Sequence, residues 1–320
     1  MGAARPGRPP AELGSRKSSP GQGGAATHAA LLLVQFAFAS QAVEAKVAML
    51  PRDAGGEGIF PEALAMLRMV GGALFFQAIL RARGSQHFAV GRADHARLFG
   101  LSILGISLNQ TLFLVGLRWT TPFAVSLLGA TIPVFAAALA VLFGKERRSL
   151  RTALGVAVAL GGVLWLTGVG SLSAQADEGA LLVALNSLSY AAYVVLSRDV
   201  VLRLGAQRVM AVVITSGGHA LDAPGAPALA RQLPELTARG WALSLYILAV
   251  PTIVAYLLNA WALGRSNATT VTIYIFLQPL LAAVLARIQL GHAVSPRAGF
   301  AAGLILVGLT IVAPRPRSPP

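Results

Sequence analysis

Nine uncharged polar residues lie within stretches that are otherwise apolar, and their amide and hydroxyl groups could bind a small molecule. Such groups hydrogen-bond a carboxylate, an amine or a sugar without the desolvation cost of a fixed charge. They could equally hydrogen-bond neighbouring helices to one another, which contributes about 1 kcal/mol per bond. Both interpretations stay open for Asn109, Gln110, Thr131, Asn186, Tyr190, Tyr256, Asn259, Tyr274 and Gln278.

Three ionisable residues, Glu44, Lys46 and Arg68, also fall within or near apolar stretches. Charged groups are costly inside a membrane, so these three are candidates for gating or ion coupling. Glu44 and Lys46 are two positions apart and would point to different sides of a helix, so Glu44 needs another partner. Arg68 lies at a depth that would allow it to pair with Glu44. Lys46 could instead extend its ammonium group to the outer interface, and Arg68 could be paired structurally inside a bundle.

Two prolines, Pro133 and Pro279, lie in the middle of apolar stretches. Proline lacks a backbone N–H and frees the carbonyl four residues earlier, here at Gly129 and Ile275. A freed carbonyl survives in a membrane only where protein or a water-filled cavity satisfies it. The prolines are therefore candidate hinges, with a simple helix kink as the alternative.

The elements that must position these residues are membrane-spanning helices. The chain has 320 residues, of which 55% are hydrophobic and only 12% charged, with a mean hydropathy of +0.68. A span needs roughly 20 apolar residues, and about ten such runs occur. We expect helices over 29–50, 61–79, 98–117, 123–143, about 152–169, 181–196, from 209 onward, 241–263, 268–290 and 296–313. The seventh is expected to be short or to break near Gly217 and Gly218, and 223–239 is expected to be a loop.

An internal repeat relates the two halves of the chain. Positions 146 apart carry matching residues over 117–162 and 263–308, including Pro133 with Pro279 and Gly162 with Gly308. Self-similarity of this kind is a more reliable guide to the architecture than any single residue. We therefore expect an all-α polytopic membrane protein with two five-helix repeats, 28–170 and 178–313. An odd number of helices per repeat predicts that the halves insert with opposite orientation, as in many secondary transporters.

Charge predicts the orientation of the chain. If both termini are cytoplasmic, 18 Lys and Arg lie inside and 5 outside, which satisfies the positive-inside rule. The net charge of +14 is then spread over cytoplasmic loops and tails and forms no single face for nucleic acid. Residues 1–27 are rich in Pro, Gly and Ser and are expected to be a disordered cytoplasmic tail, as is the short tail 314–320. We expect location in the plasma or inner membrane.

The chain resembles the EamA-domain transporters of the drug/metabolite transporter superfamily. Phe38-Ala39-Ser40-Gln41 followed by Lys46 is similar to the start of that family's first helix, although Phe38 and Ala39 replace its Trp-Gly pair. The segment from Pro61 to Arg68 is similar to its second helix. The fourth-helix pattern corresponds to Pro133, Gly144, Glu146, Gly155 and Gly162, and the second copy offers Pro279, Gly291, Gly303 and Gly308, with His292 in place of an acid.

This resemblance implies gradient-driven movement, often export, of a small metabolite such as an amino acid. The expected partners are a small-molecule substrate and the bilayer, with no cofactor and no metal site, and the oligomeric state is left open. Two other classes are weighed. A passive channel lacks a visible charge ring or filter loop. A membrane-embedded hydrolase would need a nucleophile such as Ser107, in Gly105-Ile106-Ser107, with His219 as base, and no established catalytic motif accompanies them.

Overall fold

Long apolar runs form helices in this chain because a helix satisfies its backbone hydrogen bonds within the segment. The computed structural model describes residues 24–82, 91–145, 149–167, 177–204, 206–220, 222–263, 265 and 274–312, and every regular element within these ranges is helical. The first elements are α1 (Ala25–Met49), η1 (Arg52–Ala54), α2 (Pro61–Ala82), α3 (Arg92–Ser102), η2 (Ile103–Ser107), α4 (Leu108–Trp119), α5 (Pro122–Gly129), α6 (Ile132–Leu142) and α7 (Leu150–Thr167). They are followed by α8 (Glu178–Leu204), α9 (Ala206–Ala220), α10 (Asp222–Gln232), η3 (Leu233–Glu235), α11 (Ala238–Leu248), η4 (Ala249–Val254), α12 (Ala255–Leu263), α14 (Leu277–Leu290) and α15 (Pro296–Val312).

Within the part of the chain that the structure describes, six helices are long and apolar enough to cross a membrane. They cover Ala25–Met49, Pro61–Ile79, Ala93–Trp119, Pro122–Leu142, Glu178–Leu204 and Ala238–Asn259. Shorter apolar helices cover Leu150–Leu166, Val209–Gly218, Leu277–Leu290 and Pro296–Val312. Large apolar side chains such as Leu202 and Ile288 are exposed on the outside of the bundle. This distribution is that of a polytopic membrane protein, whose outer surface faces hydrocarbon.

The stretch 123–143 is not the single helix that its hydropathy predicts. It forms α5 and α6, which are separated by a turn at Ala130 and Thr131, immediately before Pro133. Proline near the start of a helix costs little, because the N–H groups of the first turn have no intrahelical partner. The chain therefore ends one helix and begins another at Thr131.

The stretch 223–239 is also different from its prediction as a loop. Most of it is helical, in α10 and in the first residues of α11, although Pro227 lies inside α10. Packing explains the helix, because α10 lies against α2 and a methyl group added at Gly225 would lie 2.9 Å from Cβ of Met66. Tertiary contacts of this kind override local propensity.

One further boundary differs from its prediction, and the seventh predicted helix follows the first of its two alternatives. α8 extends to Leu204, eight residues beyond the predicted end at 196, because the polar residues at its end form ion pairs with neighbouring segments. α9 is short and continues unbroken through Gly217 and Gly218. The predicted start of the ninth helix, 268–273, lies outside the described residues.

Irregular segments occur at matching places in the two halves. The π-helical segments η2 and η4 begin at Ile103 and Ala249, which are 146 positions apart. The turn at Ala130 before Pro133 corresponds, at the same spacing, to the turn at Phe276 before Pro279. Thus the spacing that relates the sequences also relates local departures from α-helix.

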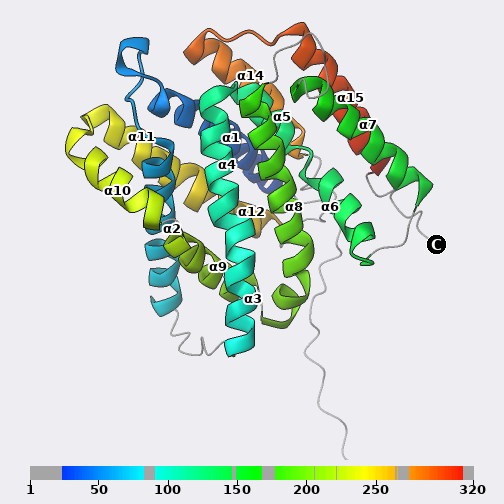
Figure 1. Cartoon of the computed structure of the whole chain (residues 1–320), viewed down its shortest axis with the longest axis horizontal. Helices are drawn as coiled ribbons and strands as arrows, with labels where there is room; N and C mark the ends of the chain where they lie inside the picture. Colours follow the sequence, from blue (N-terminus) through cyan, green and yellow to red (C-terminus); the bar gives the residue numbers. More distant parts are fainter. Residues whose placement is uncertain are drawn as a thin grey trace, which may run out of the picture.

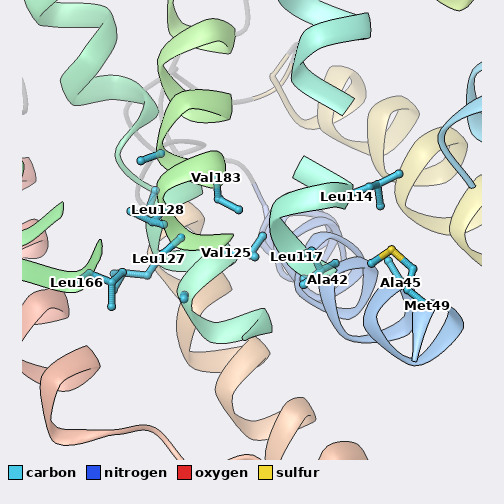
Figure 2. Close-up of a cluster of buried hydrophobic side chains, with 14 of the residues drawn as sticks. Ala42, Ala45, Met49, Leu114, Leu117, Val125, Leu127, Leu128, Leu166 and Val183 are labelled. Carbon is cyan, nitrogen blue, oxygen red and sulfur yellow. The ribbon is translucent and has the colours of Figure 1, made fainter. Parts of the chain in front are cut away.

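Apolar packing joins helices that are far apart in sequence. Figure 2 shows Leu114 and Leu117 of α4, Ala42 and Met49 of α1, and Leu127 of α5 in one buried cluster. Further members come from α7, α8 and α15. Because helices of both halves contribute to this cluster, neither half has a separate core.

The helices α7 and α15 lie side by side and run antiparallel (Figure 1). A methyl group added at Gly308 would lie 2.6 Å from the backbone oxygen of Gly155, and one at Gly162 would lie 3.0 Å from that of Ala301. Small residues permit such close approach of helix backbones in membranes. Gly161 and Gly303, grouped with these glycines by sequence, have open space beside them and do not contribute to the contact.

Replacing Gly308 by Ala is expected to lower the free energy of unfolding by about 1–3 kcal/mol, because the new methyl group would overlap the backbone of α7. Gly303→Ala on the same helix is the matched control and should be neutral or stabilising by up to about 1 kcal/mol, since alanine favours helix and meets no neighbour. Denaturation of both variants in detergent measures the difference. Equal effects would contradict the close contact at Gly308.

Candidate functional site

A cavity of about 340 Å³ lies among helices of both halves. Its volume is near the lower end of the range of about 300–1,000 Å³ that is common for small-molecule sites. Amide, hydroxyl and guanidinium groups share its wall with aromatic and aliphatic groups. The lining residues are Gln35, Phe38, Gln41, Ala42, Arg68, Asn109, Gln110, Phe113, Val125, Ser126, Gly129, Ile132, Pro133, Asn186, Tyr190, Tyr256, Asn259, Ile275 and Gln278.

Most of the polar residues singled out in the sequence lie together at this cavity. Seven of the nine line it, namely Asn109, Gln110, Asn186, Tyr190, Tyr256, Asn259 and Gln278. Thr131 and Tyr274 are not among the lining residues. The Thr131 hydroxyl donates to the backbone oxygen of Leu128 at 2.6 Å, and Oη of Tyr274 lies 2.7 Å from Nδ1 of His28. These two side chains therefore make structural contacts elsewhere in the bundle.

Equivalent positions of the two halves meet at the cavity. Four pairs of lining residues are separated by the repeat spacing of 146, so each half contributes the same structural positions with different side chains. The pairs are Gln110 with Tyr256, Phe113 with Asn259, Gly129 with Ile275, and Ile132 with Gln278. The cavity thus lies between the halves, with one wall from each.

A polar network connects the guanidinium group of Arg68 to α4 and α8. Nη1 of Arg68 donates to Oε1 of Gln110 at 2.6 Å, and Nε2 of Gln110 donates to Oδ1 of Asn109 at 3.3 Å. Nδ2 of Asn186 donates to the backbone oxygen of Asn109 at 2.7 Å. Buried polar groups connected in this way hold one another in place. A second contact, from Nε2 of Gln278 to Oε1 of Gln35 at 2.7 Å, joins α14 to α1.

Glu44 does not pair with Arg68, which corrects the geometry inferred from depth alone. Its carboxylate accepts a hydrogen bond from Nε2 of Gln289 at 2.9 Å on the outside of the bundle. Arg68 is 3% exposed and is surrounded by neutral acceptors. Depth along a helix does not determine the direction in which a side chain points. Glu44 lies on a face of α1 that does not line the cavity.

Lys46 caps the end of α4 and does not line the cavity. Its Nζ donates to the backbone oxygens of Leu117, Arg118 and Thr120 at 2.8–2.9 Å, and the residue is 8% exposed. The last carbonyls of a helix have no intrahelical donor, and a cation near them also interacts favourably with the helix dipole. The ammonium group therefore contacts the backbone at the end of a neighbouring helix and does not reach the cavity wall, while its extension to the membrane interface stays a prediction.

The two prolines differ in their relation to the cavity. Pro133 lines it, whereas Pro279 is buried in α14 away from the lining. Gly129 and Ile275, the residues four positions before each proline, both line the cavity. This placement agrees with the physical requirement that a freed backbone carbonyl lie near protein donors or a polar cavity.

Sequence reasoning missed three polar residues of the lining, Gln35, Gln41 and Ser126. The signal was present on α1, where Gln35, Phe38 and Gln41 recur every three residues and so share one helix face.

His292, which follows α14, lies at a separate cavity of about 80 Å³ together with Thr121. Burial and the nearby Lys46 ammonium group lower the pKa of His292 below its ordinary value of 6.5. Its Nδ1 is buried and has no hydrogen-bond partner among the described residues. His292 thus stands, with an unpartnered ring nitrogen, at the position where the family pattern has an acid.

Ser107, the nucleophile weighed for a hydrolase, makes a structural contact. Its hydroxyl donates to the backbone oxygen of Gly217 at 2.9 Å, which joins η2 to α9. The side chain of His219 lies outside the described residues. Within the described ranges, no group of three or more His, Asp or Glu side chains is arranged to hold a metal ion.

A polar cavity between two like halves of a helical membrane protein is an arrangement found in many membrane transporters, and comparison with known proteins identifies the family. The profile of the EamA-like transporter family matches residues 27–168 and again 177–313. The chain belongs to this family, within the drug/metabolite transporter superfamily.

Two relatives named as transporters agree with this assignment, and one solved structure shares the fold. The chain is 27% identical over 242 residues to the uncharacterized transporter YdfC of Bacillus subtilis, covering 75% of this chain and 77% of that protein. It is 24% identical over 260 residues to the uncharacterized inner membrane transporter YedA of Escherichia coli, covering 81% and 83%. A crystal structure with 17% identity aligns over 90% of this chain and 95% of its own, with a TM-score of 0.55, and so shares the fold.

Proposed function

We propose that this protein is a secondary transporter that moves a small organic metabolite across the cell membrane by alternating access, most simply as an exporter. The observation that carries the proposal is the cavity between the halves, to which matched positions of both repeats contribute. A site between like halves can be exposed first to one side and then to the other when the halves move against each other.

The proposed architecture has ten spans in two inverted repeats, with both termini in the cytoplasm. The six long apolar helices and the shorter apolar helices supply enough segments for it. Support for inversion comes from α7 and α15, which hold equivalent places in the two repeats. Arg297, at the start of α15, donates from Nε to the backbone oxygen of Trp165 near the end of α7, so the two helices run in opposite directions.

Pro133 and Pro279 are the proposed hinges. Each follows a turn that interrupts its span, and an interrupted helix can bend without breaking a continuous hydrogen-bond ladder. Glu44 and Lys46 keep only an indirect part in this proposal. Lys46 ties α1 to the end of α4, and such a contact has to persist or break as a unit when the helices move.

Replacing Asn109 or Gln278 by Ala is expected to lower the specificity constant for uptake into proteoliposomes about fivefold each, because each loses about one hydrogen bond of about 1 kcal/mol. Arg68→Ala should lower it more, since a charged donor is lost. All three variants should still insert and purify as folded protein. Flux should saturate with substrate and follow its gradient.

Gln77→Ala is the matched control for these variants. Gln77 is also an amide in a span, donating to the Thr215 hydroxyl at 3.1 Å, but it does not line the cavity. Its flux should stay close to that of the unaltered protein. Unchanged flux in all three cavity variants would remove the proposed site, and flux that never saturates would favour a channel.

A further inference from the structure

Arg68 has hydrogen-bond partners for its guanidinium group but none that carries a negative charge. Nη1 donates to Gln110, while Nε and Nη2 donate to the Thr252 hydroxyl at 3.3 and 3.1 Å. Gln41 accepts from Nη1 at 2.9 Å and from Nη2 at 3.2 Å when its amide oxygen faces the guanidinium group, the orientation that satisfies both residues. Every partner is thus a neutral amide or hydroxyl.

The acidic residues that the structure describes lie away from this charge. Among the described residues, Arg68 forms no ion pair and no Asp or Glu lines the cavity. Glu62 on the same helix is six residues away, which is about 9 Å along the axis. Glu44 is engaged with Gln289 on the outside of the bundle. The positive charge of Arg68 therefore has no fixed counter-charge within the part of the chain that the structure describes.

An arginine buried in this way favours an anion strongly. Arginine keeps its proton under physiological conditions, and taking it out of water without a counter-charge costs several kcal/mol. An anion that enters the cavity recovers part of this cost, because charges interact more strongly in a low-dielectric site. A planar carboxylate also matches the paired N–H groups of a guanidinium.

The remainder of the lining indicates what the anion carries. Phe38, Phe113 and Ile132 provide an apolar wall, and the ring of Phe38 makes an edge contact with Tyr256, with centroids 5.9 Å apart. Amide oxygens and hydroxyl groups can accept a hydrogen bond from an ammonium group, but none of the described lining residues neutralises its charge. A second positive charge beside Arg68 is therefore unfavourable.

We infer that the cavity selects a small organic acid with one net negative charge, whose carboxylate binds Arg68 in place of Gln41 or Gln110 and whose apolar part contacts Phe38 and Phe113. This inference rests on the proposed transport function. It separates organic anions from zwitterionic amino acids and from amines. Gln41 and Gln110 are neutral side chains with rotatable bonds, so one of the two amides can turn away from Arg68 when a charged carboxylate accepts its N–H groups.

A set of probes that share one skeleton and differ in charge tests the inference. On the leucine skeleton these are 2-hydroxy-4-methylpentanoate, leucine and leucinamide, with charges of −1, 0 and +1, and the same three forms are made on the phenylalanine skeleton. Binding is measured by thermal stabilisation of the purified full chain, and flux is measured in proteoliposomes. The hydroxy acid should bind at least tenfold more tightly than the amino acid, and the amide should not bind.

Arg68 is then altered in two ways. Arg68→Lys keeps the charge and should keep the order of preference with weaker binding, whereas Arg68→Gln should reduce the preference for the hydroxy acid at least tenfold. Arg287→Gln is the control, because Arg287 is exposed and donates to the backbone oxygen of Gly291 away from the cavity. If Arg68→Gln does not fold, the preference order in the unaltered protein and in Arg68→Lys decides the question.

The outcomes separate the inference from the transport proposal. Selective binding of the hydroxy acid without any flux would support the anion site and refute transport of that ligand. Flux of leucine or leucinamide equal to that of the hydroxy acid would refute the anion site and leave the transporter intact. Absence of stabilisation by either hydroxy acid would also overturn the inference.

Discussion

A cysteine at Ser149 is expected to react with a membrane-impermeant maleimide only from the cytoplasmic side, and a cysteine at Ser295 only from the opposite side. The two serines are 146 positions apart and hold equivalent places in the repeats. Both are exposed, each just before the helix that ends its repeat. In the proposed inverted arrangement, five spans per repeat would place equivalent loops on opposite faces of the membrane, so labelling should be nearly complete from one side and absent from the other.

The chain contains no cysteine, so the unaltered protein is the blank for this experiment. Serine and cysteine have nearly the same shape, and neither serine lines the central cavity. Labelling after permeabilisation is the control for accessibility and should give equal signals at the two positions. Labelling of both cysteines from the same face of intact membranes would refute the inverted arrangement.

The sequence was sufficient to predict an all-helical membrane fold and the positions of most apolar helices, while the ten spans and the inverted repeat stay predictions. Helix boundaries such as Pro61 follow from hydropathy and from proline at a first turn, both of which are local properties. The repeat places Pro133 and Pro279 146 positions apart, and the irregular segments of the two halves are separated by the same spacing. These features are encoded along the chain and need no knowledge of packing.

Features that depend on packing were not predicted. The helix α10 forms although it contains Pro227, because it lies against α2. Lys46 finds three backbone carbonyls at the end of α4, about 70 residues further along the chain. Neither contact has a local signature, since each depends on how helices from different parts of the sequence lie together.

The candidate site was partly predictable for the same reason. Polarity within an apolar span is a local signal, and it led to Asn109, Asn186 and Gln278 at the cavity. The direction in which a side chain points depends on how the helices pack, so depth alone permits a Glu44–Arg68 pair that does not form, and polarity alone does not separate Thr131 from the lining residues. A helix-face pattern such as Gln35, Phe38 and Gln41 is more informative than the depth of one residue.

Export of the proposed organic anion is expected to carry net charge across the membrane. Arg68 bears a fixed positive charge in the cavity, and no described lining residue is an acid that could carry a proton with the substrate. The cavity is neutral when an anion is bound to Arg68 and positive when it is empty. One transport cycle therefore transfers the charge of the anion. An inside-negative potential therefore favours export.

The size of this effect follows from the charge. Moving one elementary charge through 100 mV changes the free energy by about 2.3 kcal/mol, which corresponds to a concentration ratio of about 50-fold at steady state. Proteoliposomes are loaded with 2-hydroxy-4-methylpentanoate, and a potassium gradient with valinomycin holds an inside-negative potential of about 100 mV. They should release the anion until its outside concentration exceeds its inside concentration about 50-fold. Vesicles without a potential should reach equal concentrations.

Two variants make the measurement specific. Arg68→Lys should keep the dependence on potential at a lower rate, because the centre keeps its charge, whereas Arg287→Gln should change neither the rate nor the ratio. A concentration ratio that does not depend on the membrane potential would mean that a proton or another cation crosses with the anion. The described cavity has no acidic side chain to bind that ion. The proton would then have to be carried by the carboxylate of the substrate itself. A substrate protonated in this way is uncharged and would not need Arg68, so this result would contradict the anion site.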